Sequence, residues 1–211
     1  MLPFIKICGI NSLEQVKIAE KNNAFWYGLV FFKKSPRNID FHKAETIIKK
    51  SPKSIYPVAV TVNPEKNMIK DLLSIGIKNI QLHGNETIEY CKVLKETFGI
   101  KVFKGIGVET EEDLTKAKEY TNVVDWIIFD KKDNSLYGGT GKRFNWKLLS
   151  KIDININYII SGGLTHSNVL RALTLTNAKG VDVSSGVEKI PGVKSNDLIS
   201  KFCNSVKLYK R

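Results

Sequence analysis

The feature that most constrains this chain is a pattern that occurs eight times: an apolar run of strand length, a small or polar turn, and then a helical stretch. Because the runs are apolar almost throughout, both faces of each strand should be buried, as is typical of parallel strands covered by helices. Eight such units predict an α/β fold, the closed parallel sheet of a TIM (β/α)8 barrel. The expected strands are Phe4–Cys8, Phe25–Phe31, Ile55–Val62, Lys78–Leu82, Val102–Lys104, Val124–Phe129, Asn157–Ile160 and Gly180–Val183.

Helical stretches fill the intervals between these runs. The third follows Asn63-Pro64, where proline suits the first position of a helix. The alternative fold is an open, doubly wound sheet, which more usually carries a GxGxxG fingerprint after its first strand; here Cys8-Gly9-Ile10-Asn11 stands in that place. The expected helices are about Ser12–Lys21, Phe41–Lys50, Glu65–Ile75, Glu86–Phe98, Glu111–Tyr120, Trp146–Ser150, Ser167–Leu175 and Asn196–Val206.

The length of 211 residues fits one domain, so we expect residues 1–211 to form a single barrel. Charged residues interrupt the opening segment, which excludes a secretory signal there. The longest apolar stretch, Phe25–Phe32, is far too short to cross a bilayer. Three widely spaced cysteines, Cys8, Cys91 and Cys203, match neither a disulfide framework nor a zinc site. We therefore expect a cytoplasmic protein with no membrane association and no bound metal.

The net charge of +12 is compatible with a polyanionic partner such as nucleic acid. The lysines are scattered along the chain, however, and no arginine-rich tract or nucleic-acid motif appears. A high isoelectric point bears on solubility and association and not on fold. We expect a small-molecule ligand and no nucleic acid, and the composition leaves open whether the chain is a monomer or a homodimer.

Small residues follow the last two expected strands, where Gly162 and Gly163 come after the seventh strand and Ser184, Ser185 and Gly186 after the eighth. Small side chains let backbone amides approach an oxyanion closely, and phosphate sites in these barrels lie in the loops after strands seven and eight. The two loops predict a phosphorylated substrate. The alternative is that the glycines only make tight turns.

Polar residues share a face with one another near the carboxyl ends of several strands, because side chains alternate along a strand. These residues should therefore line the mouth of the barrel, where Lys6 and Asp182 would form an ion pair, since neither charge is stable when buried alone. The pairs that share a face are Lys6 with Cys8, Gln81 with His83, Ile128 with Asp130, and Asp182 with Ser184.

Each of these residues also has a purely structural interpretation. Cys8 could be a small buried apolar residue, His83 could satisfy a loop carbonyl, Asp130 could cap the next segment, and Arg37 could be a surface charge. Because these four residues are all expected at the same rim of the barrel, a functional site is favoured over four separate structural roles.

In combination, several motifs resemble the phosphoribosylanthranilate isomerase family of tryptophan biosynthesis. The resemblance runs from the first strand to the last helix. The motifs are Lys6-Ile7-Cys8-Gly9, Ser35-Pro36-Arg37-Asn38-Ile39, Gln81-Leu82-His83-Gly84, Gly138-Gly139-Thr140-Gly141 with Phe144-Asn145-Trp146, Ser161-Gly162-Gly163-Leu164, and Gly180-Val181-Asp182-Val183-Ser184-Ser185-Gly186-Val187-Glu188 with Pro191-Gly192-Val193-Lys194.

The resemblance implies an Amadori rearrangement, in which an N-linked phosphoribosyl ring opens and the aminoaldose becomes an aminoketose. It makes Asp130 the general acid for the ring oxygen and Cys8 the general base at C2 of the sugar. Desolvation by the apolar strand before Asp130 would keep that carboxyl partly protonated, and Lys6 is a candidate for lowering the thiol pKa.

By the same resemblance, Arg37 would hold the anthranilate carboxylate in a forked pair, and Gln81, His83 and Asp182 would also bind the substrate. The phosphate would lie against the small-residue loops named above. The resemblance implies no cofactor and no metal.

One position departs from the family pattern: Asn145 stands where the family usually has aspartate. Asparagine can still cap a helix at this point. Two rival functions remain. One is another phosphate-binding barrel enzyme, such as a sugar-phosphate synthase or epimerase; the metal-binding histidines of an epimerase are poorly matched by His42, His83 and His166. The other is a catalytically inactive, basic binding module, which would lack the acid or the base.

Overall fold

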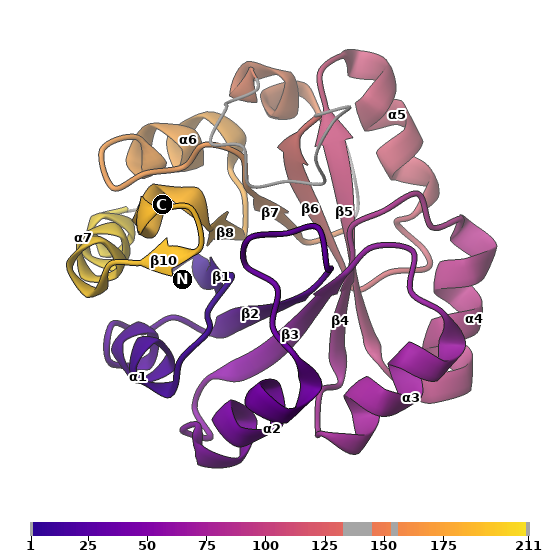
Figure 1. Cartoon of the computed structure of the whole chain (residues 1–211). Coiled ribbons are helices and arrows are strands. Elements are labelled where there is room, and N and C mark those ends of the chain that lie inside the picture. Colours follow the sequence, from indigo (N-terminus) through magenta and orange to yellow (C-terminus); the bar gives the residue numbers. More distant parts are fainter. Residues whose placement is uncertain (1, 133–144, 153–155, 210–211) are drawn as a thin grey trace.

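Eight parallel strands close into a barrel with helices on the outside (Figure 1). The computed structural model describes residues 2–132, 145–152 and 156–209. Each strand pairs with the next along the chain, and β1 pairs with β8, which confirms the predicted closed sheet and excludes the open alternative. The strands are β1 (Phe4–Cys8), β2 (Trp26–Phe31), β3 (Tyr56–Thr61), β4 (Asn79–Leu82), β5 (Lys101–Val108), β6 (Trp126–Lys131), β7 (Tyr158–Ile160) and β8 (Gly180–Val183).

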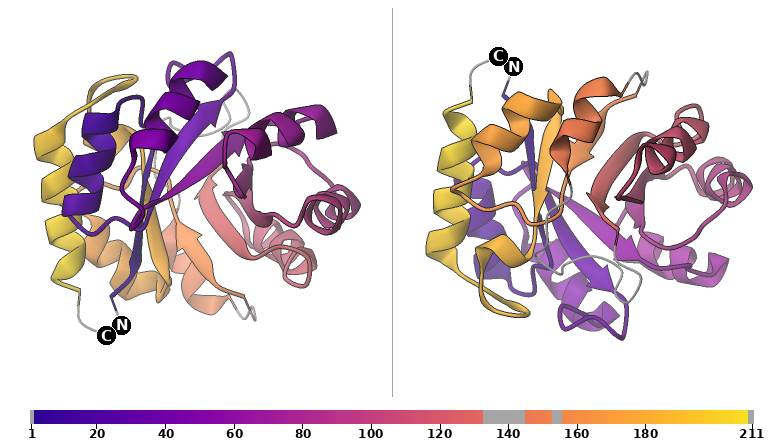
Figure 2. Two further views of the ribbon diagram at one scale, coloured as in Figure 1. Left: turned by 90° about the horizontal axis from the view of Figure 1, so that it is seen from below. Right: turned by 90° about the horizontal axis from the view of Figure 1, so that it is seen from above.

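The helices surround this sheet, and several begin at a residue whose side chain accepts a hydrogen bond from a backbone N–H three positions later. Ser12, Asp40, Thr87 and Ser195 make this N-cap bond at the starts of α1, α2, α4 and α7. Figure 2 shows α7 beside α1. The helices are α1 (Leu13–Lys21), α2 (Phe41–Lys50), α3 (Lys66–Ser74), α4 (Ile88–Phe98), α5 (Glu111–Glu119), the 3₁₀ helix η1 (Trp146–Lys151), α6 (Val169–Thr176), the 3₁₀ helix η2 (Ser185–Val187) and α7 (Asn196–Lys207).

Aromatic side chains fill the amino-terminal half of the barrel. Trp26, Phe103 and Trp126 contact one another there, and the Phe103 and Trp126 rings are stacked with centroids 6.2 Å apart. Ile128 and Ile159 belong to the same buried cluster. This packing closes the barrel at one end, so that a ligand site is left to the carboxyl ends of the strands.

The structure differs from the sequence-based expectations in three places. Strand β5 continues past Lys104, because Ile106 and Val108 extend the pairing with β6. Helix α3 begins only at Lys66, so Pro64 lies before the helix and not at its first position. After η2 the chain forms an unexpected antiparallel hairpin, β9 (Glu188–Ile190) with β10 (Val193–Lys194).

Within the described ranges, none of the helices combines the length and the apolar character that a membrane span requires. The part of the chain that carries the Gly138-Gly139-Thr140-Gly141 motif lies outside the described residues. Asn145, directly after it, does cap η1 as expected, with its side chain accepting from the backbone N–H of Lys147 at 3.2 Å.

Candidate active site

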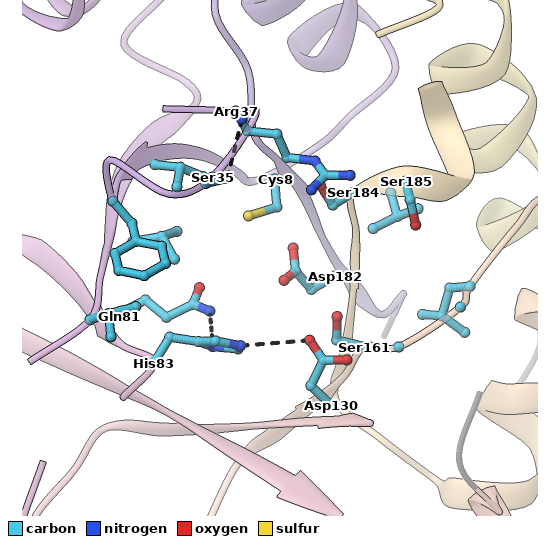
Figure 3. Close-up of a pocket in the computed structure, with 18 residues that line it drawn as sticks. Cys8, Ser35, Arg37, Gln81, His83, Asp130, Ser161, Asp182, Ser184 and Ser185 are labelled. Atoms are coloured by element: carbon cyan, nitrogen blue, oxygen red, sulfur yellow. Dashed lines mark hydrogen bonds and ion pairs between the residues drawn. The ribbon is translucent and has the colours of Figure 1, made fainter. Parts of the chain in front are cut away.

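A pocket opens at the carboxyl ends of the strands (Figure 3), with about 720 Å³ of space between its walls when the open solvent at its mouth is included. The pocket brings together all but one of the residues that the sequence predicted for the site. Those that line it are Cys8, Arg37, Gln81, His83, Asp130, Gly162, Gly163, Asp182, Ser184 and Ser185.

Gly186 is the exception, since it does not line the pocket. It lies in η2, where an added Cβ atom would overlap the backbone carbonyl oxygen of Leu164. The absence of a side chain at Gly186 therefore lets the loops after β7 and β8 pack backbone against backbone. The expectation that Gly186 contacts a phosphate stays a prediction.

Cys8 ends strand β1 inside the barrel mouth and is buried among Val30 and Val60. Burial, with a contribution from Asp182, raises the pKa of its thiol above the ordinary value of 9.0, although Lys6 and Lys194 oppose this shift. Lys6 thus lowers the pKa of the Cys8 thiol, as predicted, but the net shift is upward. The thiol of the free protein is therefore largely protonated at neutral pH.

Asp130 lies across the opening from Cys8, with Asp182 between them (Figure 3). Burial raises the pKa of the Asp130 carboxyl to about 6, although the backbone N–H of Lys131, which donates to Oδ1 at 2.7 Å, opposes this shift. With this pKa, roughly a tenth of Asp130 is protonated at pH 7, far more than for an ordinary aspartate. Desolvation thus raises the pKa of Asp130, as predicted from the apolar strand that precedes it.

His83 stands between Gln81 and Asp130. Its Nδ1 lies 2.9 Å from the amide nitrogen of Gln81, and its Nε2 lies 3.8 Å from Oδ2 of Asp130. Burial, with Lys104 and Lys6, lowers the pKa of His83 to about 3, so the imidazole is neutral. With the amide oriented in this way, Nδ1 accepts and the ring proton is on Nε2, which faces Asp130.

A glycine in the neighbouring strand makes room for this imidazole. A Cβ atom added to Gly105 would overlap Nδ1 of His83. On the other side, Oε1 of Gln81 is buried and has no hydrogen-bond partner among the described residues. It is an acceptor within the pocket wall that a ligand hydroxyl can satisfy.

Lys6 and Asp182 form the predicted ion pair, with 3.0 Å between Nζ and Oδ1. Burial alone lowers the pKa of Lys6, but Asp182 and Cys8 outweigh this effect and raise it. Lys6 is therefore charged, and it fixes Asp182 at the centre of the pocket floor.

Arg37 is buried, so its interpretation as an ordinary surface charge is wrong. Its Nε and Nη2 each donate to one carboxylate oxygen of Glu188 at 2.7 Å. Glu188 also accepts from Lys194, at 2.7 Å. Neither Glu188 nor Lys194 was among the predicted site residues. Both belong to the motif after β8, and their opposite charges were the signal that could have identified them.

The loop after β7 has the shape expected of an anion site. Gly162 and Gly163 have φ angles of +77° and +66°, a conformation that favours glycine. Asn168 holds the loop, since its side chain accepts from the backbone N–H of Thr165 and donates to the carbonyl of Gly163. Ser161 also lines the pocket and was not among the predicted site residues.

The comparison with known proteins agrees with this geometry. The profile of the N-(5'phosphoribosyl)anthranilate (PRA) isomerase family matches residues 5–205. A curated N-(5'-phosphoribosyl)anthranilate isomerase from Rhizobium etli is 40% identical over 210 residues, which covers 98% of this chain and 95% of the relative. The chain belongs to this family of isomerases.

Solved structures support the assignment. The phosphoribosyl anthranilate isomerase from Thermotoga maritima is 34% identical and superimposes with a TM-score of 0.90, covering 98% of this chain and 99% of that one. A second isomerase structure, 32% identical with a TM-score of 0.84 and the same coverage, is a complex with reduced 1-(o-carboxyphenylamino)-1-deoxyribulose 5-phosphate. This isomerase is therefore an enzyme of tryptophan biosynthesis with a TIM-barrel fold.

Across residues 2–132, 145–152 and 156–209, no group of three or more His, Cys, Asp or Glu side chains is arranged to hold a metal ion.

Proposed function

We propose that the chain converts N-(5-phosphoribosyl)anthranilate to 1-(2-carboxyphenylamino)-1-deoxyribulose 5-phosphate, with Asp130 as the general acid and Cys8 as the general base. The observation that carries this proposal is that a carboxyl with a pKa of about 6 and a buried thiol line opposite sides of one pocket. Proton transfer by two positioned groups is what an aldose–ketose rearrangement requires.

The reaction divides into ring opening, removal of the proton from C2, and conversion of the resulting enolamine to the ketone. Asp130 donates its proton to the ring oxygen while the bond from C1 to that oxygen breaks, and the anthranilate nitrogen supplies the electron pair that forms the C1=N bond. The thiolate of Cys8 then takes the proton from C2, and the electrons of that bond neutralise the iminium to give an enolamine. The enolamine gains a proton at C1 and loses one from the C2 hydroxyl, which leaves the ketone. No atoms or electrons are gained or lost overall.

The rest of the pocket would orient this substrate. Arg37 would hold the anthranilate carboxylate, since a guanidinium suits a planar anion. The loops with Gly162, Gly163, Ser184 and Ser185 would hold the phosphate. Gln81, His83 and Asp182 would contact the sugar between the two ends.

Other aspects of the proposal concern the whole chain. We propose that the chain acts as a single barrel domain in the cytoplasm, on a small phosphorylated molecule and not on nucleic acid or membranes. It needs no cofactor in this scheme, and either a monomer or a homodimer fits it.

One assay tests the reaction. Purified protein should remove the fluorescence of phosphoribosylanthranilate with saturable, enzyme-dependent kinetics. A sugar-phosphate synthase or epimerase would leave the fluorescence unchanged, and so would a basic binding module. In the last case, retention of nucleic acid that is weakened by salt would replace turnover.

A further inference from the structure

We propose that Glu188, itself held by Lys194, is a positioning residue that fixes the guanidinium of Arg37 for the carboxylate of the substrate. The inference rests on the proposed function, because it concerns the substrate end that carries the carboxylate. It adds two residues to the site that act through Arg37 and not on the reacting atoms.

The first observation is the geometry of the pair. Glu188 accepts from both Nε and Nη2 of Arg37 at 2.7 Å, and only 9% of the arginine side chain and 3% of the glutamate side chain are exposed. A two-point contact fixes both the plane and the rotation of a guanidinium. Arginine has five N–H donors, so one edge can be fixed by the protein while another faces a ligand.

The second observation is that Glu188 is itself held in place. The ammonium of Lys194 has no exposed surface; it donates to Oε1 of Glu188 at 2.7 Å, and to the carbonyl and hydroxyl oxygens of Ser184 at 3.0 and 3.1 Å. Burial alone would raise the pKa of Glu188, but Arg37 and Lys194 outweigh it and lower that pKa. The carboxylate is therefore ionised at neutral pH and cannot turn away from Arg37 without leaving Lys194.

The third observation is the support beneath Arg37. A Cβ atom added to Gly9, in the turn after β1, would lie 2.6 Å from Cδ of Arg37. The aliphatic part of the arginine thus lies directly over the turn that follows Cys8. Gly9 below and Glu188 at the side restrict the rotation of the arginine side chain before any ligand binds. Binding of a ligand therefore costs little additional side-chain entropy at Arg37.

The arrangement also connects the two anion sites. Lys194 contacts Glu188 at the Arg37 end and Ser184 in the loop proposed for the phosphate. The hairpin of β9 and β10 supplies both Glu188 and Lys194. We therefore assign to this hairpin the task of setting the distance between the group that binds the carboxylate and a loop that binds the phosphate.

The test combines one protein change with one ligand change. Dissociation constants are measured by calorimetry for reduced 1-(2-carboxyphenylamino)-1-deoxyribulose 5-phosphate and for the matched compound whose ring lacks the carboxylate. In Glu188→Gln, the carboxylated compound should bind about tenfold more weakly, and the compound without the carboxylate should change by less than about twofold. With substrate, KM should rise far more than kcat falls.

Two further variants separate positioning from folding. Glu188→Asp keeps the charge on a shorter side chain, and its loss should be intermediate and again confined to the carboxylated compound. Asp125→Asn is the matched control, because Asp125 is also a carboxylate paired with a lysine (Lys95, 3.1 Å) and a backbone N–H (Val102, 2.8 Å), at the opposite end of the barrel. It should leave both dissociation constants unchanged.

The outcomes distinguish this inference from the proposed function. If the wild-type protein neither binds the carboxylated compound nor converts phosphoribosylanthranilate, the proposed function fails. If the wild-type protein does both, equal weakening of the two compounds in the Glu188 variants overturns the positioning role. Unchanged or tighter binding of the carboxylated compound in both variants overturns it as well, and tighter binding would mean that Glu188 competes with the substrate for Arg37.

Discussion

Lys6 and Asp182 are 176 positions apart in the sequence, yet their side chains form an ion pair of 3.0 Å inside the barrel, where Lys6 has no exposed surface. The pair joins the first strand to the last and lies directly below Cys8. It therefore serves the closure of the sheet and the electrostatics of the pocket at the same time.

Asp182→Ala should destabilise the protein strongly, because it leaves the ammonium of Lys6 buried without its partner. The expected loss is about 3 to 5 kcal/mol in the free energy of unfolding, measured by urea or guanidinium titration. Glu45→Gln removes one partner of the exposed pair with Lys49 and should leave the stability almost unchanged, because water and salt screen such a pair. An unchanged unfolding midpoint for Asp182→Ala would contradict the role of the pair.

The pH dependence of kcat/KM should show a broad plateau. The active form needs Asp130 protonated, with a pKa of about 6, and Cys8 deprotonated, with a pKa raised above 9.0. Between these pKa values, the gain in thiolate with rising pH cancels the loss of protonated Asp130. Below the lower pKa the rate should fall because thiolate disappears, and above the higher one because Asp130 has lost its proton. Stopped-flow or steady-state rates from about pH 5 to about pH 10 check this; a single sharp optimum near neutrality would be inconsistent with it.

Asp130→Asn should abolish most turnover and yet stabilise the fold at neutral pH. The folded state holds the Asp130 proton more tightly than the unfolded state, since the pKa rises from 3.8 to about 6, so stability falls as pH rises through this window. Removing the ionisable group should recover up to about 3 kcal/mol at pH 7 and much less at pH 4. Thermal unfolding at both pH values measures this difference, and near-native turnover would remove Asp130 from its role as the acid.

Cys8→Ser should reduce turnover by at least about a hundredfold, because a serine hydroxyl is a far weaker base than a thiolate. The side chains are similar in size, so the unfolding midpoint should change little. Cys203→Ser is a useful control, since Cys203 is a buried thiol of α7 far from the pocket. Activity of Cys8→Ser close to wild type would assign the base to another group.

Arg37→Ala should mainly weaken substrate binding. It removes a guanidinium from the pocket wall and leaves Glu188 with Lys194. KM should rise by about tenfold or more, and kcat should change less, as measured from initial rates over a range of substrate concentrations. A fall in kcat with KM unchanged would argue against a carboxylate clamp.

The sequence predicted those parts of the site that lie on strands. The alternation of side chains placed Cys8 with Lys6 and His83 with Gln81 on the inner face, and this arrangement is what the structure shows. The same rule, applied to the first and last strands of a closed sheet, identified Asp182 as the partner of Lys6. Periodicity succeeds there because a strand leaves only two directions for a side chain.

Loops have no such period, and the sequence was less informative about them. The partner of Arg37 could not be predicted. Glu188 lies in the β9–β10 hairpin, whose sequence does not show the alternation of apolar and polar residues that would indicate a strand pair. Gly186 was assigned to the phosphate because it is a small residue in the loop after the eighth strand; its close packing against the backbone of Leu164 could not be predicted. The direction of the Cys8 pKa likewise depends on how completely the thiol is buried, and burial depends on residues of several strands.

The aromatic packing of Trp26, Phe103 and Trp126 lies in the half of the barrel opposite the pocket. The aromatic packing is therefore separate from the residues proposed for catalysis, whereas the buried Lys6–Asp182 pair contributes to both the fold and the pocket. Substitutions in the aromatic core should therefore change thermal stability with little effect on the pocket. Substitutions in the pocket wall should in turn leave the packing of the aromatic core unchanged.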